Sequence, residues 1–338
     1  MTPRLLILSL LALSVVGPVA PQPAPQALSI VLPPQLLANR PATLAVLGPD
    51  GHLAVGVIVN VGDGQRLITD AIGRATFVAP PDGALLAVAQ GVSAAALVDA
   101  APSRVAASTA TIAPDVSQRD RFAICGSGFS ANVGADTVTI NGDRAFVLAA
   151  SPICVVVLAQ SRTLAGAAKI EIDTPGTHAT ASTSLVALDF FPPGPPLQPG
   201  HKGKLFVRAE GTADPLHLII ENHSPDVIRF IRGKTQDLRT SGGLQNQAAI
   251  QVQAIRSGEF SFHARIAAPA NTTVAARYLE IAESVAPKGM EGELKAIASG
   301  LAHHPRDDQK ARAALERLAN SAPAGSLRTL IEAADDAL

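Results

Sequence analysis

The sequence has no tryptophan, a single tyrosine and only two cysteines among its 338 residues. Exported sugar-binding modules usually meet their ligands with exposed aromatic rings, so this shortage argues against a carbohydrate partner. The formal net charge of −1 provides no global field that would draw the chain to nucleic acid or to an anionic membrane. The two cysteines lack the close Cys-x-x-Cys spacing of redox motifs, which excludes that chemistry.

Residues 1–20 are predicted to be a signal peptide. They contain a basic start at Arg4, a short apolar run and small residues before Ala20. The apolar run is too short to span a bilayer, which takes roughly 20 apolar residues, and no later segment would anchor the chain. We therefore expect a secreted, periplasmic or cell-surface protein, bacterial by its alanine-rich and lysine-poor composition, with no membrane span after signal removal. Residues 21–27 form a stiff proline-rich spacer.

Residues 28–101 alternate between apolar and polar side chains, which predicts a β-sandwich of short strands and turns. Asp50-Gly51 separates two such runs, over 42–47 and 53–59, and predicts a β-hairpin there.

A motif later in this unit resembles the bacterial immunoglobulin-like modules of surface proteins, in which a strand often reads T-D-x-x-G-x-A-x-F. The matching residues are Thr69, Asp70, Gly73, Ala75 and Phe77. The resemblance implies a fold and carries no catalytic residue.

Residues 109–188 contain a G-x-G-F turn that ends at Phe129 and a V-x-I-N-G hairpin around Asn141. This unit resembles the IPT/TIG family, which implies an immunoglobulin-like sandwich with a structural or adhesive role. Because many proteins share that fold, the resemblance gives no specific function.

Cys125 and Cys154 lie in two apolar, β-branched runs of this second unit. A small, even number of cysteines in an exported protein predicts a structural disulfide. A bridge that closes a loop of about thirty residues should contribute about 3–4 kcal/mol of stability in the chain-entropy model. The alternative is a pair of buried free thiols.

A proline-rich linker is predicted over residues 189–203 and a third β-sandwich over 204–268. From residue 271 the apolar period becomes helical, and prolines and glycines divide residues 271–338 into α-helical hairpins. The two hairpins are either tandem repeats or chance matches between alanine-rich helices. The stiff joints predict an extended rod whose helical end docks on another protein.

No catalytic, cofactor-binding or metal site is predicted. His303 and His304 precede Asp307 and Asp308, but these aspartates are better explained as the negative start of a helix. Ser127 lacks the strand–helix context of a nucleophile elbow, so we interpret it as a turn residue. Other polar groups of the third unit are interpreted as ordinary strand or loop residues, namely His217, Glu221, Asp226 and His263.

The sequence therefore predicts a mainly β fold, in which tandem immunoglobulin-like β-sandwiches precede a small all-α C-terminal module. The expected function is that of an exported non-enzymatic protein with no cofactor, which binds a protein partner or a cell-surface or matrix component. The alternative is a scaffold or accessory subunit of an exported enzyme or secretion complex.

Overall fold

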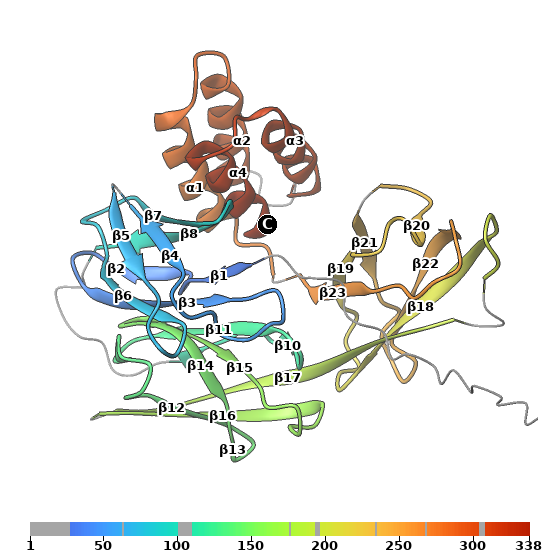
Figure 1. The fold of residues 1–338 in the computed structure, drawn as a ribbon, viewed down its shortest axis with the longest axis horizontal. Coiled ribbons are helices and arrows are strands. Elements are labelled where there is room, and N and C mark those ends of the chain that lie inside the picture. The colour runs from blue at the N-terminus through green and yellow to red at the C-terminus, as the bar shows by residue number, and fades with distance from the viewer. Residues whose placement is uncertain are drawn as a thin grey trace, which may run out of the picture.

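A computed structural model of the chain describes residues 28–62, 64–100, 110–175, 177–192, 197–233, 235–267, 269–303 and 308–338. It is mainly β, with strands β1–β23 followed by helices α1–α4 (Figure 1). The strands form tandem immunoglobulin-like sandwiches and the helices form a C-terminal module, which confirms the predicted fold class. The predicted signal peptide and spacer, His304 and Asp307 lie outside the described residues.

The first sandwich packs two sheets around a core that includes Leu44, Val59 and Phe77. The strands of one sheet are β1 (Ser29–Val31), β3 (Pro41–Leu47) and β6 (Arg74–Val78). The strands of the other, in spatial order, are β2 (Gln35–Leu37), β8 (Val92–Asp99), β7 (Ala84–Ala89), β4 (Ile58–Val61) and β5 (Gln65–Ile68).

The turn predicted at Asp50-Gly51 forms, but its hairpin is much shorter than predicted. Leu47 and Leu53 make an antiparallel bridge, and the amides of Gly48 and Ala54 donate to the carbonyls of His52 and Val46 at 2.7 and 2.8 Å. The chain then crosses to the other sheet, where β4 pairs with β5 and β7. The turn signal is local, whereas the pairing of β4 is decided by the core that it covers.

The T-D-x-x-G-x-A-x-F motif has a structural explanation in this sandwich. The Thr69 hydroxyl accepts from the Val57 amide at 2.9 Å and donates to the Ala54 carbonyl at 2.7 Å. Asp70 accepts from two backbone amides of the following turn. Gly73 has a φ of +67°, and a Cβ there would lie 2.7 Å from that of Leu53. Each motif residue therefore holds a turn or the core in place.

The second sandwich packs around Ile124, Ile140, Val155 and Ile170. One face consists of β9 (Ala110–Thr111), β11 (Arg121–Gly126), β15 (Cys154–Leu158) and β14 (Phe146–Ser151). The other consists of β13 (Asp143–Arg144), β12 (Thr137–Ile140), β16 (Gly166–Thr174), β17 (Thr177–Phe191) and β10 (Asp115–Ser117), with β10 parallel to β17.

The first and second sandwiches are in direct contact. Thr43 of β3 pairs with Ala150 of β14, which joins their sheets into one. A small core between them contains Val31, Ala45, Leu148, Ala149 and Val156.

Strand β17 belongs to both the second and the third sandwich. Its first part pairs with β16, and residues 187–191 pair with β18. Because side chains alternate along a strand, Leu185 enters the core of the second sandwich while Val186 and Leu188 enter that of the third. The strand therefore continues three residues into the segment predicted as a linker.

The third sandwich has its core around Val207, Leu218, Ile220 and Ile250. Besides the end of β17, one sheet contains β18 (Lys202–Glu210), β22 (Gln247–Ala254) and β20 (Ile228–Phe230). The facing sheet contains β21 (Thr235–Arg239), β19 (His217–Asn222) and β23 (Phe262–Ile266).

The helical module consists of α1 (Thr272–Val285), α2 (Glu291–His303), α3 (Asp308–Ser321) and α4 (Ser326–Asp336). The side chain of Asn271 caps α1 by accepting from the amide of Val274 at 3.1 Å. Within the described chain, none of these helices combines the length and hydropathy that crossing a bilayer requires.

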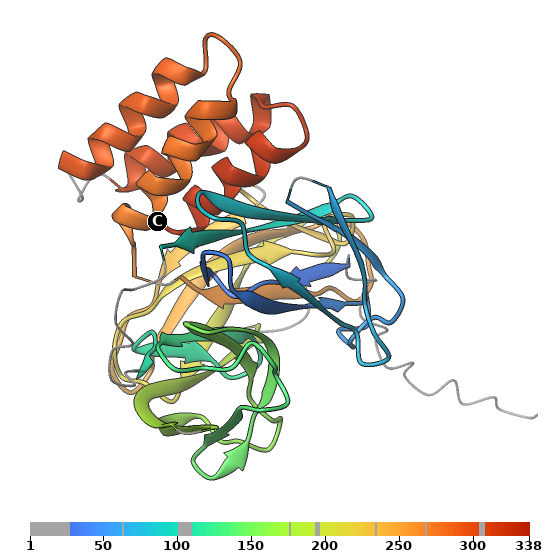
Figure 2. The ribbon, with the colours of Figure 1, turned by 90° about the vertical axis from the view of Figure 1, so that its left-hand side faces the viewer.

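The helices pack against β8 of the first sandwich (Figure 2). Leu97 of β8 is fully buried among helical side chains, and Arg277 of α1 forms an ion pair with Asp99 at 2.6 Å. The Ser93 and Thr329 hydroxyls lie 2.7 Å apart across the same contact. The expected rod with a free helical end is therefore wrong, because these apolar surfaces are covered within the chain.

Candidate functional site

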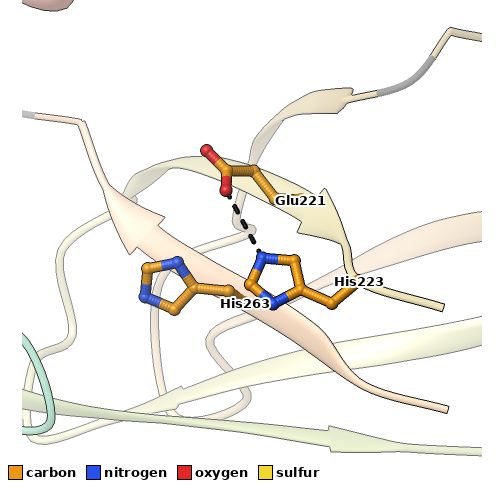
Figure 3. A group of neighbouring side chains, drawn as sticks. All are labelled: Glu221, His223 and His263. Carbon is orange, nitrogen blue, oxygen red and sulfur yellow. Dashed lines mark ion pairs between the residues drawn. The ribbon is translucent and has the colours of Figure 1, made fainter. Parts of the chain in front are cut away.

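Three potential ligand-bearing side chains converge at one end of the third sandwich. Glu221 of β19 is the cross-strand partner of His263 in β23, and His223 lies two residues beyond Glu221. Residues two apart on an extended chain face the same side of a sheet, so the three side chains share one face. One potential ligand atom from each lies within 4.8 Å of the others (Figure 3). We call these three residues the histidine cluster.

The histidine cluster also touches the second sandwich. Asp120, in the turn between β10 and β11, places Oδ1 2.8 Å from His263 Nε2. This hydrogen bond raises the pKa of His263, while burial of the ring opposes the shift. Asp120 therefore holds one nitrogen of this ring, and the other nitrogen, Nδ1, is left for another partner.

The other two side chains of the cluster, Glu221 and His223, are half-buried. Glu221 Oε2 lies 3.5 Å from His223 Nε2, and the two imidazole centroids are 6.0 Å apart. Imidazole nitrogens and a carboxylate oxygen are the donor types that suit Zn²⁺ and similar ions.

A groove with a volume of about 880 Å³ forms a second candidate site, where the first sandwich, the second sandwich and the helical module meet. Ile30 and Val92 line it from the first sandwich, Arg121 from the second, and Val274 and Asp336 from the helices. Edge strands β1 and β9 also contribute residues to its wall. We call this space the three-module groove.

Tyr278 is the single aromatic side chain among the described residues that line the three-module groove. It is only 5% exposed, and its burial raises the pKa of the hydroxyl to about 12. The groove therefore offers apolar and charged side chains without an exposed ring on which a sugar could stack.

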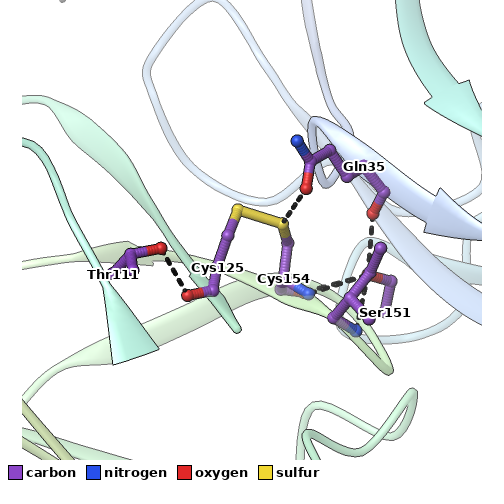
Figure 4. Close-up of a disulfide and its surroundings, with 6 residues drawn as sticks. Gln35, Thr111, Cys125, Ser151 and Cys154 are labelled. Carbon is purple, nitrogen blue, oxygen red and sulfur yellow. Dashed lines mark hydrogen bonds between the residues drawn. A yellow bond between two sulfur atoms is a disulfide. The ribbon is translucent and has the colours of Figure 1, made fainter. Parts of the chain in front are cut away.

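The predicted disulfide joins Cys125 and Cys154, directly opposite residues of β11 and β15 (Figure 4). Cys154 is fully buried, whereas Cys125 lines the three-module groove. The Ser151 hydroxyl accepts from the Cys154 amide at 3.0 Å and donates to the Gln35 carbonyl at 2.8 Å. The bridge thus lies beside a contact between the first two sandwiches.

The other residues considered from sequence lie apart from these sites. His217 pairs with Asp237 on β21, and Asp226 pairs with Arg256. His303 contacts the carbonyl of Ser299, one turn earlier in its own helix, at 2.8 Å. Ser127 lies in a bend after β11, as its interpretation as a turn residue requires.

The sequence did not reveal the histidine cluster. Glu221 and His223 have the i, i+2 spacing of one strand face, which was the available local signal. His263 joins them only through the register of β19 and β23, and Asp120 only through the packing of two sandwiches. Neither long-range relation can be derived from periodicity.

No family model matches the sequence. No curated protein matches it either. Among solved structures, the I9–I11 tandem of titin is 11% identical, with a TM-score of 0.21, and the match covers 71% of this chain and 94% of that one. A Bacteroides ovatus protein, SGBP-B of a mixed-linkage glucan utilization locus, was solved with a mixed-linkage heptasaccharide. It is 10% identical, with a TM-score of 0.23, and the match covers 69% of this chain and 75% of that one.

A structure of Dscam is 11% identical, with a TM-score of 0.23, and the match covers 68% of this chain and 72% of that one. At such TM-scores these likenesses carry no argument about ligand or partner. The fold class therefore rests on the sheets and cores of the chain itself.

Proposed function

We propose that this is an exported, non-enzymatic binding protein that recognises a protein partner through its immunoglobulin-like modules. The signal-peptide pattern of residues 1–20 supports export, as does the disulfide, because such bridges persist in oxidising compartments. We further propose that the first sandwich is a bacterial immunoglobulin-like module and the second an IPT/TIG module. We place the mature protein in the periplasm, at the cell surface or outside the cell.

The three-module groove is the observation that carries this proposal. Its volume of about 880 Å³ lies within the range of ligand-binding clefts, roughly 300–1,000 Å³. The strands β1 and β9 end the path of their sheet, and an extended peptide can add to such an edge. Apolar side chains beside Arg121 and Asp336 suit a peptide with both apolar and charged residues better than they suit a glycan.

The proposal is tested by affinity capture from envelope and secreted fractions of the native cells. Thr111 is exposed on β9 and lines the groove, so Thr111→Arg places a long cation there without entering a core. We expect wild type to retain a specific partner and Thr111→Arg to reduce its recovery about tenfold or more, which corresponds to roughly 1.4 kcal/mol.

The matched control is Thr180→Arg, at an exposed position of β17 outside the groove. It should retain the partner as wild type does. If Thr111→Arg recovers as much partner as wild type does, the partner does not bind in the three-module groove. Stable capture of a single enzyme or secretion component would instead favour the role of an accessory subunit.

A further inference from the structure

We propose that the histidine cluster is a binding site for a divalent transition-metal ion of the Zn²⁺ type. The ligands are the Glu221 carboxylate and the imidazoles of His223 and His263. This inference is independent of the three-module groove, which none of these residues lines.

The spacing of the three side chains supports coordination. Zinc binds imidazole nitrogen and carboxylate oxygen at about 2.0–2.2 Å, so two ligands of a tetrahedral ion lie about 3.3–3.6 Å apart. Glu221 Oε2 and His223 Nε2 already lie 3.5 Å apart. All three ligand atoms lie within 4.8 Å of one another, which is close to this spacing.

The backbone holds two of the ligands on paired strands and the third, His223, directly after the end of β19. Glu221 and His263 are cross-strand partners, and the amide of His223 donates to the Ser261 carbonyl at 3.0 Å. The ligands therefore come from two segments in fixed register. Sites built on strands hold their ligands more accurately than sites built on loops.

The polar atoms that face the proposed ion are open to it. Among the described residues, no hydrogen bond engages the Glu221 carboxylate or the His223 ring, which are 43% and 30% exposed. A contact of 3.5 Å between them is longer than an ordinary hydrogen bond. Glu221 and His223 form an ion pair with each other at this distance, and an ion would bind both groups at once.

Asp120 is the positioning residue of the site. Metal-binding histidines commonly use one ring nitrogen for the ion and the other for a carboxylate, which fixes the orientation of the ring. Asp120 contacts His263 Nε2 at 2.8 Å, so Nδ1 is the nitrogen assigned to the ion. Because Asp120 belongs to the second sandwich, the site also couples this turn to the third sandwich.

The experiment is a titration of the full mature chain with Zn²⁺, read by calorimetry and by competition with a chromophoric chelator. We expect one saturable site per chain. His223→Ala and His263→Ala should each weaken it by about a hundredfold or more, and Asp120→Asn by roughly 10- to 100-fold. The matched control is His217→Ala, which removes a carboxylate-paired histidine from the same strand and should bind Zn²⁺ as wild type does.

X-ray absorption at the zinc edge gives a readout that a purely structural role would not produce. The wild type should show two imidazole ligands at about 2.0–2.1 Å, and His223→Ala and His263→Ala one fewer each. Glu221→Gln, nearly the same shape, tests the carboxylate in a chain that keeps its fold. Absence of saturable binding, wild-type affinity in Glu221→Gln and both histidine variants, or a zinc spectrum without imidazole would each overturn the proposal.

Discussion

Asp136 is a buried carboxyl group immediately before β12, with only 1% of its surface exposed. Its two oxygens lie 3.2 and 3.0 Å from the amide nitrogen of Ser130. Burial raises the pKa of Asp136 from 3.8 to about 6, against the opposing effect of this hydrogen bond. The folded chain therefore holds this proton to a higher pH than the unfolded chain does.

The sign of the pH dependence follows from this shift. The contribution of Asp136 to stability is fully present below pH 3.8 and is lost as pH rises through about 6. Between pH 4 and 7, the free energy of unfolding of wild type should fall by about 2–3 kcal/mol relative to that of Asp136→Asn, because each pKa unit corresponds to 1.36 kcal/mol. Urea unfolding at several pH values measures the difference.

The control for this residue is Asp82→Asn, which removes an exposed carboxylate from a loop of the first sandwich. The difference in free energy of unfolding between Asp82→Asn and wild type should stay constant across the same pH range. A constant difference for Asp136→Asn would show that burial does not perturb the carboxyl group as described.

At the scale of elements, the disulfide connects adjacent strands of one sheet, and its loop spans 29 positions from Cys125 to Cys154. The expected effect of Cys125→Ala together with Cys154→Ala is a loss of about 3–4 kcal/mol in the free energy of unfolding. Denaturant unfolding of the double variant and of the oxidised wild type measures it. Wild type unfolded with a reductant should resemble the double variant, and equal stability of the oxidised and reduced proteins would contradict the prediction.

Strand periodicity made much of the β architecture predictable. The Asn141-Gly142 turn has φ values of +52° and +86°, and it joins β12 to β13 as its residue types require. The Asp50-Gly51 turn also forms, but its strand pairing stops at the Leu47–Leu53 bridge, because β4 pairs in the opposite sheet. The residue types of a turn predict where the chain reverses, whereas packing in the core determines which strands then pair.

The candidate sites depend on contacts that local patterns do not contain. The three-module groove needs the docking of helices on β8, and the histidine cluster needs the pairing of β19 with β23. Both are long-range consequences of which apolar faces become buried together. The disulfide was predictable because the cysteine count and the predicted export constrain it without reference to register.

At the scale of the whole molecule, the helical module completes the first sandwich. We expect Leu97→Arg on β8, and Tyr278→Lys on the facing side of α1, each to release the helices, since both side chains are buried at this contact. In small-angle scattering, wild type should have a radius of gyration near the roughly 20 Å of a compact chain of this length, and each variant should have a larger one.

Ser93→Ala is the control for that experiment, because it removes one hydroxyl contact with Thr329 and leaves the apolar packing intact. It should keep the wild-type radius. If both charged variants keep the wild-type radius of gyration, the apolar contact with β8 is not what holds the helices in place. If wild type itself gives an extended scattering profile, the chain is a rod after all.

The docking of helices α1–α4 on the first sandwich also has a consequence for the order of folding. The apolar face formed by Leu97, Ala84, Leu86 and Ala95 is synthesised before the helices that cover it. Until those helices are made, we expect the nascent protein to carry an exposed apolar patch that a chaperone can hold.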